Sequence, residues 1–157
     1  MPDIEKSCEI AVSVRAAYDQ WTQFEEFPRF MGSVESVRQI DDKNLHWRAN
    51  LVGKAVEWNA EIIEQIPDRV ISWRSTSGPR NEGSVLFEAL RGDQCRVSLR
   101  LKVSPSTFGE KVGVAVGVTS ARVGGDLDRF KKFIEARRLP TGQWRGEIHG
   151  DSVRRPF

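Results

Sequence analysis

The sequence predicts an α+β domain in which a curved antiparallel sheet wraps around one long C-terminal helix. Runs of alternating apolar and polar residues fill the middle of the chain, so each strand has one dry and one wet face. Turn-forming residues separate these runs at short intervals, which indicates hairpin connections. One apolar stripe with helical spacing follows Pro105. A one-faced sheet and an amphipathic helix bury their apolar faces together, because neither is stable alone.

Residues 4–14 alternate weakly and predict the first strand. Residues 15–30 have helical spacing and predict a helical hairpin, whose second helix should begin at Pro28 because proline fits a first turn. The clearest alternation covers residues 45–51, 56–62 and 97–103, and we expect seven strands in all. Residues 112–137 predict a helix about 39 Å long. Pro140 and Gly142 should stop it.

The chain has 157 residues, of which 39% are hydrophobic and 29% charged, as in an ordinary globular domain. We expect one domain at residues 1–140 and a basic tail at residues 141–157. The uncharged apolar stretch 112–121 is shorter than the roughly 20 residues of a transmembrane helix. The first residues show no secretory signal, so we expect a cytoplasmic protein. Cys8 and Cys95 have no metal or redox spacing and are interpreted as reduced structural thiols.

Positive charge is concentrated at the C-terminal end. Residues 137–157 hold five arginines against Glu147 and Asp151, whereas the rest of the chain is nearly neutral. A nucleic-acid-binding protein normally carries its basic face on the folded body, so we expect no nucleic-acid partner. Trp144 could dock on the body, join a dimer contact or touch a membrane surface transiently. We favour docking, and we expect residues 1–140 to fold without the tail.

Catalytic motifs are absent from the sequence. It has no nucleophile elbow, phosphate loop, dinucleotide fingerprint or cluster of His and Cys ligands, so we expect neither a metal nor another cofactor. His46 falls on the predicted wet face of a strand, and His149 falls in the tail. We interpret His46 as a surface residue rather than a general base. No catalytic residue is identified.

Several stretches resemble one protein group closely. They are YDQWTQFEEFPRFMGSVESVRQID at 18–41, LHWRA at 45–49, EWNAEIIEQIPDRVISWRS at 57–75 and DLDRFKKFIEARRLPTGQWRGEI at 126–148. These stretches resemble the bacterial polyketide cyclase/dehydrase group of the SRPBCC superfamily, which has the START-like, or birch-pollen-allergen-like, helix-grip fold. The resemblance covers nearly the whole chain. It implies a deep cavity between the concave sheet face, the helical hairpin and the long helix.

Mapped onto this sequence, the implied cavity lining comprises Phe27, Phe30, Trp47, Trp58, Trp73, Phe87, Leu99, Val116, Ser120 and Val123. Tryptophans on three strands of one face can build a thick core or wall a pocket, and both interpretations stay open. The small residues Gly113, Gly117, Ser120 and Gly124 have two interpretations as well. They allow close approach of helix and sheet, or they leave space for a guest. We expect a cavity above about 300 Å³.

The aromatase/cyclase members of this group commonly have an arginine before the Pro-Asp corner and a tyrosine after the helical hairpin. The matching positions here are Gln65 and about Val34, and neither side chain can do the same chemistry. Simple alternation puts Gln65 opposite Trp58, so either a bulge intervenes or one face assignment is wrong. Polar side chains that could turn inward instead are Arg48, Glu61, Arg74 and Tyr18, although the surface or structural interpretation is preferred for each.

Three functional hypotheses follow. The first is a binding module for a small hydrophobic molecule such as a lipid, a quinone or a polyketide-like aromatic. The second is a polyketide cyclase or dehydratase that positions its substrate in the cavity. The third is a regulatory or partner-binding protein with a vestigial cavity. The sequence does not predict the ligand or the oligomeric state.

Overall fold

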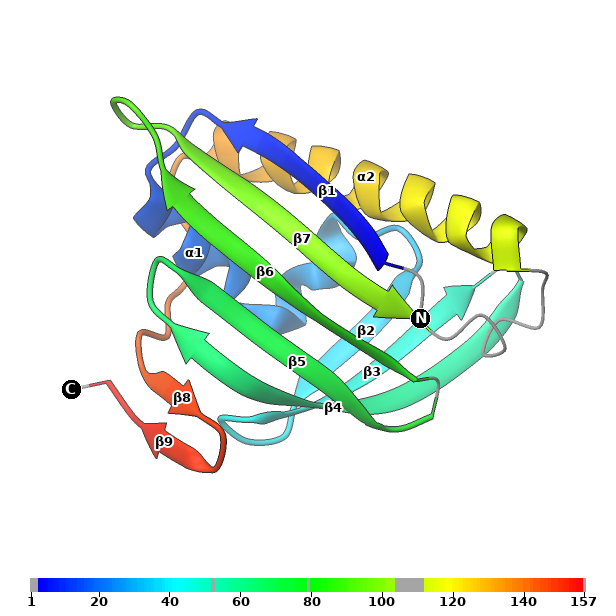
Figure 1. Cartoon of the computed structure of the whole chain (residues 1–157). Helices are drawn as coiled ribbons and strands as arrows, with labels where there is room; N and C mark the ends of the chain where they lie inside the picture. The colour runs from blue at the N-terminus through cyan, green and yellow to red at the C-terminus, as the bar shows by residue number, and fades with distance from the viewer. Residues whose placement is uncertain (1–2, 52, 79, 104–111, 157) are drawn as a thin grey trace.

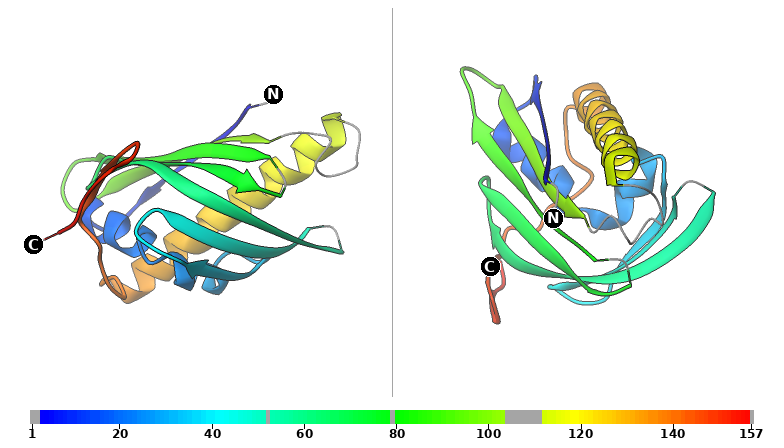
Figure 2. Two further views of the ribbon diagram at one scale, coloured as in Figure 1. Left: turned by 90° about the horizontal axis from the view of Figure 1, so that it is seen from below. Right: turned by 45° about the vertical axis from the view of Figure 1, so that its right-hand side comes forward.

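The computed structural model describes residues 3–51, 53–78, 80–103 and 112–156, with only the backbone described at residues 3, 51, 103 and 112–121. A strongly curved antiparallel sheet surrounds the long helix α2, as the two views of Figure 2 show. The predicted α+β helix-grip arrangement is therefore confirmed. The elements, in chain order (Figure 1), are β1 (Asp3–Ile10), α1 (Val14–Trp21), the 3₁₀ helix η1 (Phe24–Arg29), β2 (Val34–Gln39), β3 (Asn44–Leu51), β4 (Lys54–Ile66), β5 (Val70–Ser77), β6 (Asn81–Ala89), β7 (Cys95–Val103), α2 (Val112–Arg137), β8 (Glu147–His149) and β9 (Ser152–Arg154).

The main sheet has the strand order β1-β7-β6-β5-β4-β3-β2, and every pairing is antiparallel. Consecutive strands from β2 to β7 are hairpin neighbours, as the turn signals predicted. The described strands number nine rather than seven, because the tail adds β8 and β9. β8 pairs with Glu64 and Gln65 of β4, just beyond the point where β3 ends its pairing at Glu61. β8 thus pairs with the part of β4 that extends beyond its pairing with β3.

The helical hairpin differs from the prediction in one detail. Ser13 caps α1 by accepting a hydrogen bond from the Ala16 N–H at 3.1 Å, as a serine at this position commonly does. The second helix, η1, begins at Phe24, and Pro28 lies near its end rather than at its start. Because proline has no N–H, η1 lacks the hydrogen bond that residue 28 would otherwise donate.

A bulge in β4 answers the question about Gln65. The pairing of β4 with β5 shifts register between Ile62 and Glu64, so Ile63 is an extra residue. Trp58, Ala60 and Ile62 face inward on one side of the bulge, and Gln65 faces inward on the other. Gln65 is almost completely buried. Both face assignments are therefore correct, and the bulge reconciles them.

Helix α2 spans Val112–Arg137, as the apolar stripe predicted. It ends because Arg138 adopts a left-handed conformation with φ of 68° and donates its N–H to the carbonyl of Ile134 at 2.7 Å. Gly124 lies on the side of α2 that faces β1, where an added Cβ would contact Lys6 at 3.8 Å. That is an ordinary van der Waals distance, so an alanine would fit at this position and close approach does not require the glycine. The side chain at Ser120 and the glycine positions 113 and 117 lie outside the described side chains.

The tail packs against the body. Ile148 is completely buried, and Trp144 packs against the hydrophobic core, as the docking interpretation expected. Gln20 and Thr141 exchange two hydrogen bonds, one from the Thr141 N–H at 2.8 Å and one from the Gln20 amide at 3.1 Å. Arg155 pairs with Asp42 at 2.6 Å. The positive charge of the tail is thus partly neutralised within the molecule, and the boundary at Pro140 stays a prediction.

Candidate functional site

A cavity of about 180 Å³ lies between the concave face of the sheet and α2. It is smaller than the 300 Å³ or so that we expected, and its wall is mostly apolar. Its lining comprises Trp21, Phe24, Phe27, Met31, Ser33, Val34, Leu45, Trp47, Ala49, Trp58, Ile62, Ile71, Trp73, Asn81, Leu99, Leu101, Arg122, Val123, Asp126 and Leu127.

Aromatic rings dominate the wall of this cavity. The indoles of Trp47 and Trp58, which are directly paired on β3 and β4, stack in parallel with their centroids 5.7 Å apart. Phe27 packs against Trp47 with its ring tilted and the centroids 5.6 Å apart. Trp47, Trp58 and Trp73 each stay partly exposed although they point inward from the sheet. Large apolar side chains in this position are normally covered, so their exposure marks the open part of the cavity.

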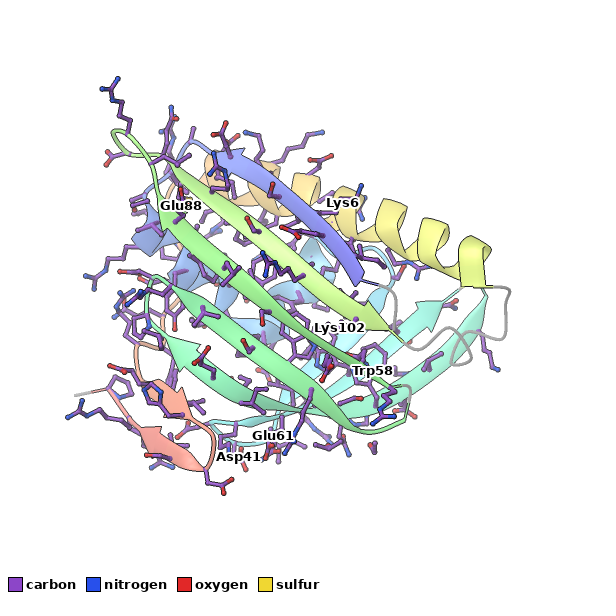
Figure 3. The ribbon with its side chains drawn as sticks, viewed as in Figure 1. Lys6, Asp41, Trp58, Glu61, Glu88 and Lys102 are labelled. Carbon is purple, nitrogen blue, oxygen red and sulfur yellow. The ribbon has the colours of Figure 1, made fainter. Side chains whose placement is uncertain are left out.

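The partly exposed lining residues lie on several elements. Trp47, Trp58 and Trp73 come from β3, β4 and β5, and Trp58 is labelled in Figure 3. Ser33, Asn81 and Arg122 are partly exposed as well. Fully buried lining residues such as Ile62 form the floor. We call the partly exposed part of the described lining the mouth of the cavity.

The predicted lining residues divide into three groups. Phe27, Trp47, Trp58, Trp73, Leu99 and Val123 line the cavity. Phe30 and Phe87 do not line it, because other rings cover them: Phe30 packs against Phe130, and Phe87 packs against Tyr18. The side chains of Val116 and Ser120 lie outside the described ones. Contact of any of these residues with a ligand stays a prediction.

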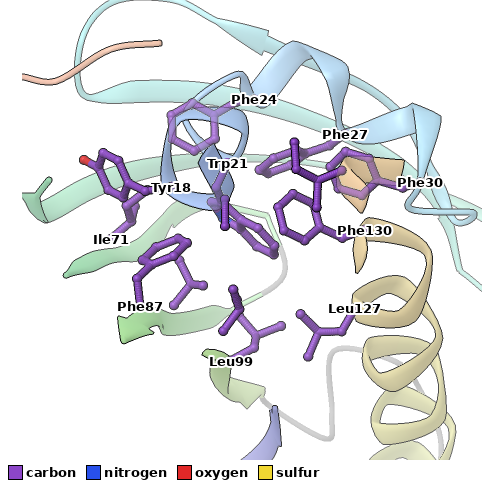
Figure 4. Close-up of a cluster of buried hydrophobic side chains, with 14 of the residues drawn as sticks. Tyr18, Trp21, Phe24, Phe27, Phe30, Ile71, Phe87, Leu99, Leu127 and Phe130 are labelled. Carbon is purple, nitrogen blue, oxygen red and sulfur yellow. The ribbon is translucent and has the colours of Figure 1, made fainter. Parts of the chain in front are cut away.

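The other end of the concave face is filled by a tight aromatic core, which Figure 4 shows. Trp21 packs edge-on against Phe130 of α2 at 4.8 Å and against Phe87 at 6.3 Å. Phe130 also contacts Phe30, and its side chain is completely buried. At this end, side chains of α1 and of the second half of α2 fill the space between helix and sheet, whereas at the mouth part of that space stays open.

Behind this core lies a buried polar cluster. The Gln65 amide donates to the Tyr18 hydroxyl at 3.1 Å. Arg145 of the tail pairs with Asp19 at 2.5 Å and with Asp68 at 2.8 Å, and its guanidinium lies 5.5 Å from the centre of the Tyr18 ring. None of these five residues lines the cavity. Gln65, which matches the arginine position of the aromatase/cyclases, therefore faces a structural cluster and not the cavity.

Burial and charge act in opposite directions on this cluster. Burial raises the pKa of Asp19, and the contact with Arg145 opposes that rise. Burial lowers the pKa of Arg145, but the two carboxylates outweigh it, so the pKa is raised overall. The raised pKa of Asp19 favours its neutral form, whereas the raised pKa of Arg145 favours its charged form. The short contacts of Arg145 with both carboxylates favour an ionised cluster.

Few polar groups reach the cavity. Asp126 accepts from Arg129 and from the backbone N–H of Gly32, and burial raises its pKa against both contacts. The Trp73 N–H donates to Asn81 at 3.3 Å. The Trp47 N–H is buried and has no acceptor among the described residues. Both indole N–H groups are thus covered or bonded, and the carboxylate of the wall is already engaged.

Sequence reasoning missed several lining residues that come from the helical hairpin and from α2. Trp21 was placed in the hairpin packing, and Arg122 and Asp126 were not considered. One signal for these two residues was present, because they are four residues apart and form a row next to the apolar residues Val123 and Leu127 on the helix.

Of the alternative polar residues, Arg48, Glu61 and Arg74 lie on the outer face of the sheet, whereas Tyr18 is buried on α1 and does not line the cavity. Glu61, labelled in Figure 3, pairs with Arg74 at 3.1 Å, and Arg48 pairs with Glu35 at 3.2 Å. The two ring nitrogens of His46 contact Asn59 at 2.7 Å and Glu57 at 3.1 Å. His46 is therefore on the wet face, as predicted, and does not line the cavity.

Within the described ranges, no group of three or more His, Cys, Asp or Glu side chains could hold a metal ion. None of the helices there is long and apolar enough to cross a membrane. Both cysteines are free, and burial raises the pKa of each thiol to about 11.

Comparison with known proteins gives three kinds of similarity. Residues 10–133 match the model of a family described as polyketide cyclase / dehydrase and lipid transport. An uncharacterized 17.2 kDa protein of Streptomyces lincolnensis is 44% identical over 149 residues, which cover 94% of this chain and 99% of that protein.

Solved structures share the fold. The crystal structure of a Deinococcus radiodurans protein is 26% identical, with a TM-score of 0.68 over 87% of this chain and 99% of its own. A Thermus thermophilus protein reaches a TM-score of 0.74 at 22% identity, with the same coverage of both chains. The Zhui aromatase/cyclase from a Streptomyces species reaches 0.70 at 13% identity, over 87% of this chain and 94% of that one. Similarity to the last two proteins shows a common fold and nothing more.

Proposed function

The chain belongs to the polyketide cyclase / dehydrase and lipid transport family, and from that membership we propose that it binds one small hydrophobic molecule in the cavity between the sheet and α2. The observation that carries the proposal is the partial exposure of Trp47, Trp58 and Trp73 on the concave face. Proteins of this family bind small hydrophobic molecules. An aromatic-walled cavity with few polar groups is the kind of site that such a molecule fills.

The size of the cavity restricts the ligand. A volume of about 180 Å³ lies below the range of about 300–1,000 Å³ typical of drug-sized ligands. Much of the wall consists of aromatic rings, of which Trp47 and Trp58 stack on each other. Aromatic rings pair favourably with a further ring in offset-stacked or edge-on arrangements. We therefore favour a flat ligand of two or three fused rings over a long acyl chain.

A cyclase or dehydratase activity has less support. General acid or base catalysis needs a titratable group within hydrogen-bonding reach of the reacting atoms. In the described part of the wall the titratable groups are Arg122 and Asp126, and Asp126 is held by Arg129 and Gly32. Gln65 and Tyr18 bond to each other outside the cavity. Binding without turnover is thus the function that this wall supports best.

The proposal is tested with a neutral fluorescent probe, N-phenyl-1-naphthylamine, and a variant that fills the cavity. Ala49 is buried and lines the cavity, so Ala49→Leu adds three carbons to the cavity space. We expect saturable probe binding by the wild type and at least a tenfold loss in the variant. Native mass spectrometry of the purified protein then identifies any co-purifying ligand.

Ala55→Leu is the matched control, since Ala55 is exposed on the neighbouring strand and does not line the cavity. It should bind the probe as the wild type does. Circular dichroism and thermal unfolding verify that both variants are folded. Equal binding by the wild type and Ala49→Leu would refute binding in this cavity.

A further inference from the structure

Helix α2 presents a charged edge along the cavity mouth. Arg122, Asp126 and Arg129 are spaced four and three residues apart, so they lie on one side of the helix. Arg129 donates to Asp126 and also, through Nε, to the carbonyl of Phe30 at 2.8 Å. Asp126 accepts in addition from the Gly32 N–H. These contacts fasten α2 to the end of η1 and the connection that follows it.

Arg122 differs from the other two residues on this edge. It lines the cavity one helical turn before Asp126, and it forms no ion pair or hydrogen bond with any residue that the structure describes. The positive charge of Arg122 acts to lower the pKa of Asp126, but the Asp126 carboxylate already accepts hydrogen bonds from Arg129 and from the Gly32 N–H. The edge carries two guanidinium groups and one carboxylate. Asp126 is engaged by Arg129, so Arg122 is the charged side chain of the described lining that has no counter-ion contact with a described residue.

The hydrogen-bonding groups of the wall include indole N–H groups. The Trp47 N–H is buried without an acceptor among the described residues. The Trp73 N–H has only a long bond of 3.3 Å to Asn81. Donors beside a low-dielectric pocket gain most from an acceptor that carries negative charge. The Trp47 N–H is covered, so the donor that an anionic group at the mouth can reach is Arg122.

We propose that the cavity selects an amphipathic ligand, with a flat aromatic body among the indoles and one anionic group, such as a carboxylate, held by Arg122 at the mouth. This inference rests on the proposed function, because it assigns the polar end of the same ligand. Arg122 stays partly exposed, so the anionic group keeps some of its water. The preference for charge should then be moderate, about tenfold, because exposed ion pairs are screened.

Two compounds of nearly the same shape test the charge preference. 2-Naphthoate and 2-naphthamide share one aromatic body and differ in the charge of the head group. Calorimetric titration should show that the wild type binds the carboxylate about tenfold more tightly. In Arg122→Gln that preference should disappear, with amide affinity changed less than about twofold. Arg122→Lys should keep part of it, because the charge is retained without the bidentate geometry.

Arg91→Gln is the matched control, since Arg91 is an exposed arginine in the β6–β7 turn and does not line the cavity. It should keep the full preference. The indole N–H resonances of the five tryptophans locate the bound compound by NMR. Those of Trp58 and Trp73 should shift on binding, and that of Trp144 in the tail should not.

The possible results distinguish the role of Arg122 from the proposed binding of a hydrophobic molecule in the cavity. Equal affinity of the wild type for both compounds, or equal weakening of both in Arg122→Gln, overturns the role of Arg122 and leaves the cavity as an apolar binding site. Shifts confined to Trp144 or to no tryptophan overturn both proposals. A carboxylate preference that vanishes only in Arg122→Gln supports the inference.

Discussion

The two ends of the concave sheet face are built from the same kind of residue and behave differently. At the closed end, rings such as Trp21 and Phe130 interlock, and the polar groups behind them bond to one another. At the open end, Trp47 and Trp58 stack on each other but stay partly exposed, and a guanidinium has no described partner. Aromatic residues on a sheet thus make a core only where a second element covers them. Helix α1 covers one end and not the other.

The largest difference in stability between the two ends should appear when one aromatic ring is removed from each. Phe130→Ala should lower the free energy of unfolding by about 4 kcal/mol, because it empties a completely buried site. Trp58→Ala should cost less than about 2 kcal/mol, since part of the larger indole is already uncovered. Urea unfolding measures both. Equal losses would mean that the two ends are equally well packed.

Removing the charge that joins the tail to the closed end should have the next largest effect. Arg145→Met leaves the buried Asp19 with only the exposed Arg15, 3.7 Å away, as a cationic partner, and we expect a loss of about 3 kcal/mol at pH 7. Burial already raises the pKa of Asp19, and losing Arg145 should raise it further. The loss should therefore shrink at about pH 4.5, where the folded variant can protonate Asp19 at less cost. Unfolding at the two pH values measures the difference.

Arg154→Met is the control, because Arg154 is an exposed arginine of the same tail. It should change stability by less than about 0.5 kcal/mol. Similar losses in the two variants, or a loss from Arg145→Met that grows at acidic pH, would contradict an ionised cluster. A loss of the expected size would also argue against our expectation that residues 1–140 fold independently.

A smaller effect is expected from the hydroxyl of Tyr18. Tyr18→Phe leaves the Gln65 amide N–H without its acceptor and should cost about 1 kcal/mol. Burial raises the pKa of Tyr18 strongly, and it is the only tyrosine in the chain. Ultraviolet absorbance should thus show no phenolate in the folded protein near pH 10, where a free tyrosine ionises. Probe binding should not change, because Tyr18 lies outside the cavity.

The smallest effect concerns His46, which belongs to neither end. Its hydrogen bonds to Asn59 and Glu57 raise its pKa, so its contribution to stability is present below its unfolded pKa of about 6.5 and is lost as pH rises through the folded value. His46→Ala should cost no more than about 0.5 kcal/mol at pH 5.5 and less at pH 8. Any loss of probe binding in this variant would contradict its place on the outer face.

The sequence predicted the closed end less well than the open end. Period-two alternation identifies Trp47 and Trp58 as inward-facing, and the stripe on the helix identifies Val123. Neither pattern shows which inward residues another element covers, and so Phe30 and Phe87 were assigned to the cavity wall. Coverage depends on contacts between residues far apart in the chain, such as Phe30 with Phe130.

In the tail, too, the sequence pattern does not show a contact between distant parts of the chain, in this case the pairing of two strands. Residues 147–149 are too few to form a recognisable pattern, and they become a strand because β4 extends beyond β3. Arg145 was counted as part of a basic surface, although it pairs with two carboxylates. Sequence composition gives the charge of a segment but not the location of its partners.

The bulge at Ile63 has a consequence for comparing this chain with its relatives position by position. A single inserted residue lets β4 point Trp58 into the cavity and Gln65 into the polar cluster, although the two are an odd number of positions apart. A relative without that insertion would expose the residue aligned with Gln65 to solvent and bury its neighbour. Equivalent letters in an alignment would then stand on opposite sides of the sheet. Residue roles before the Pro67-Asp68 corner can be transferred between such proteins only after the number of residues in this strand has been matched.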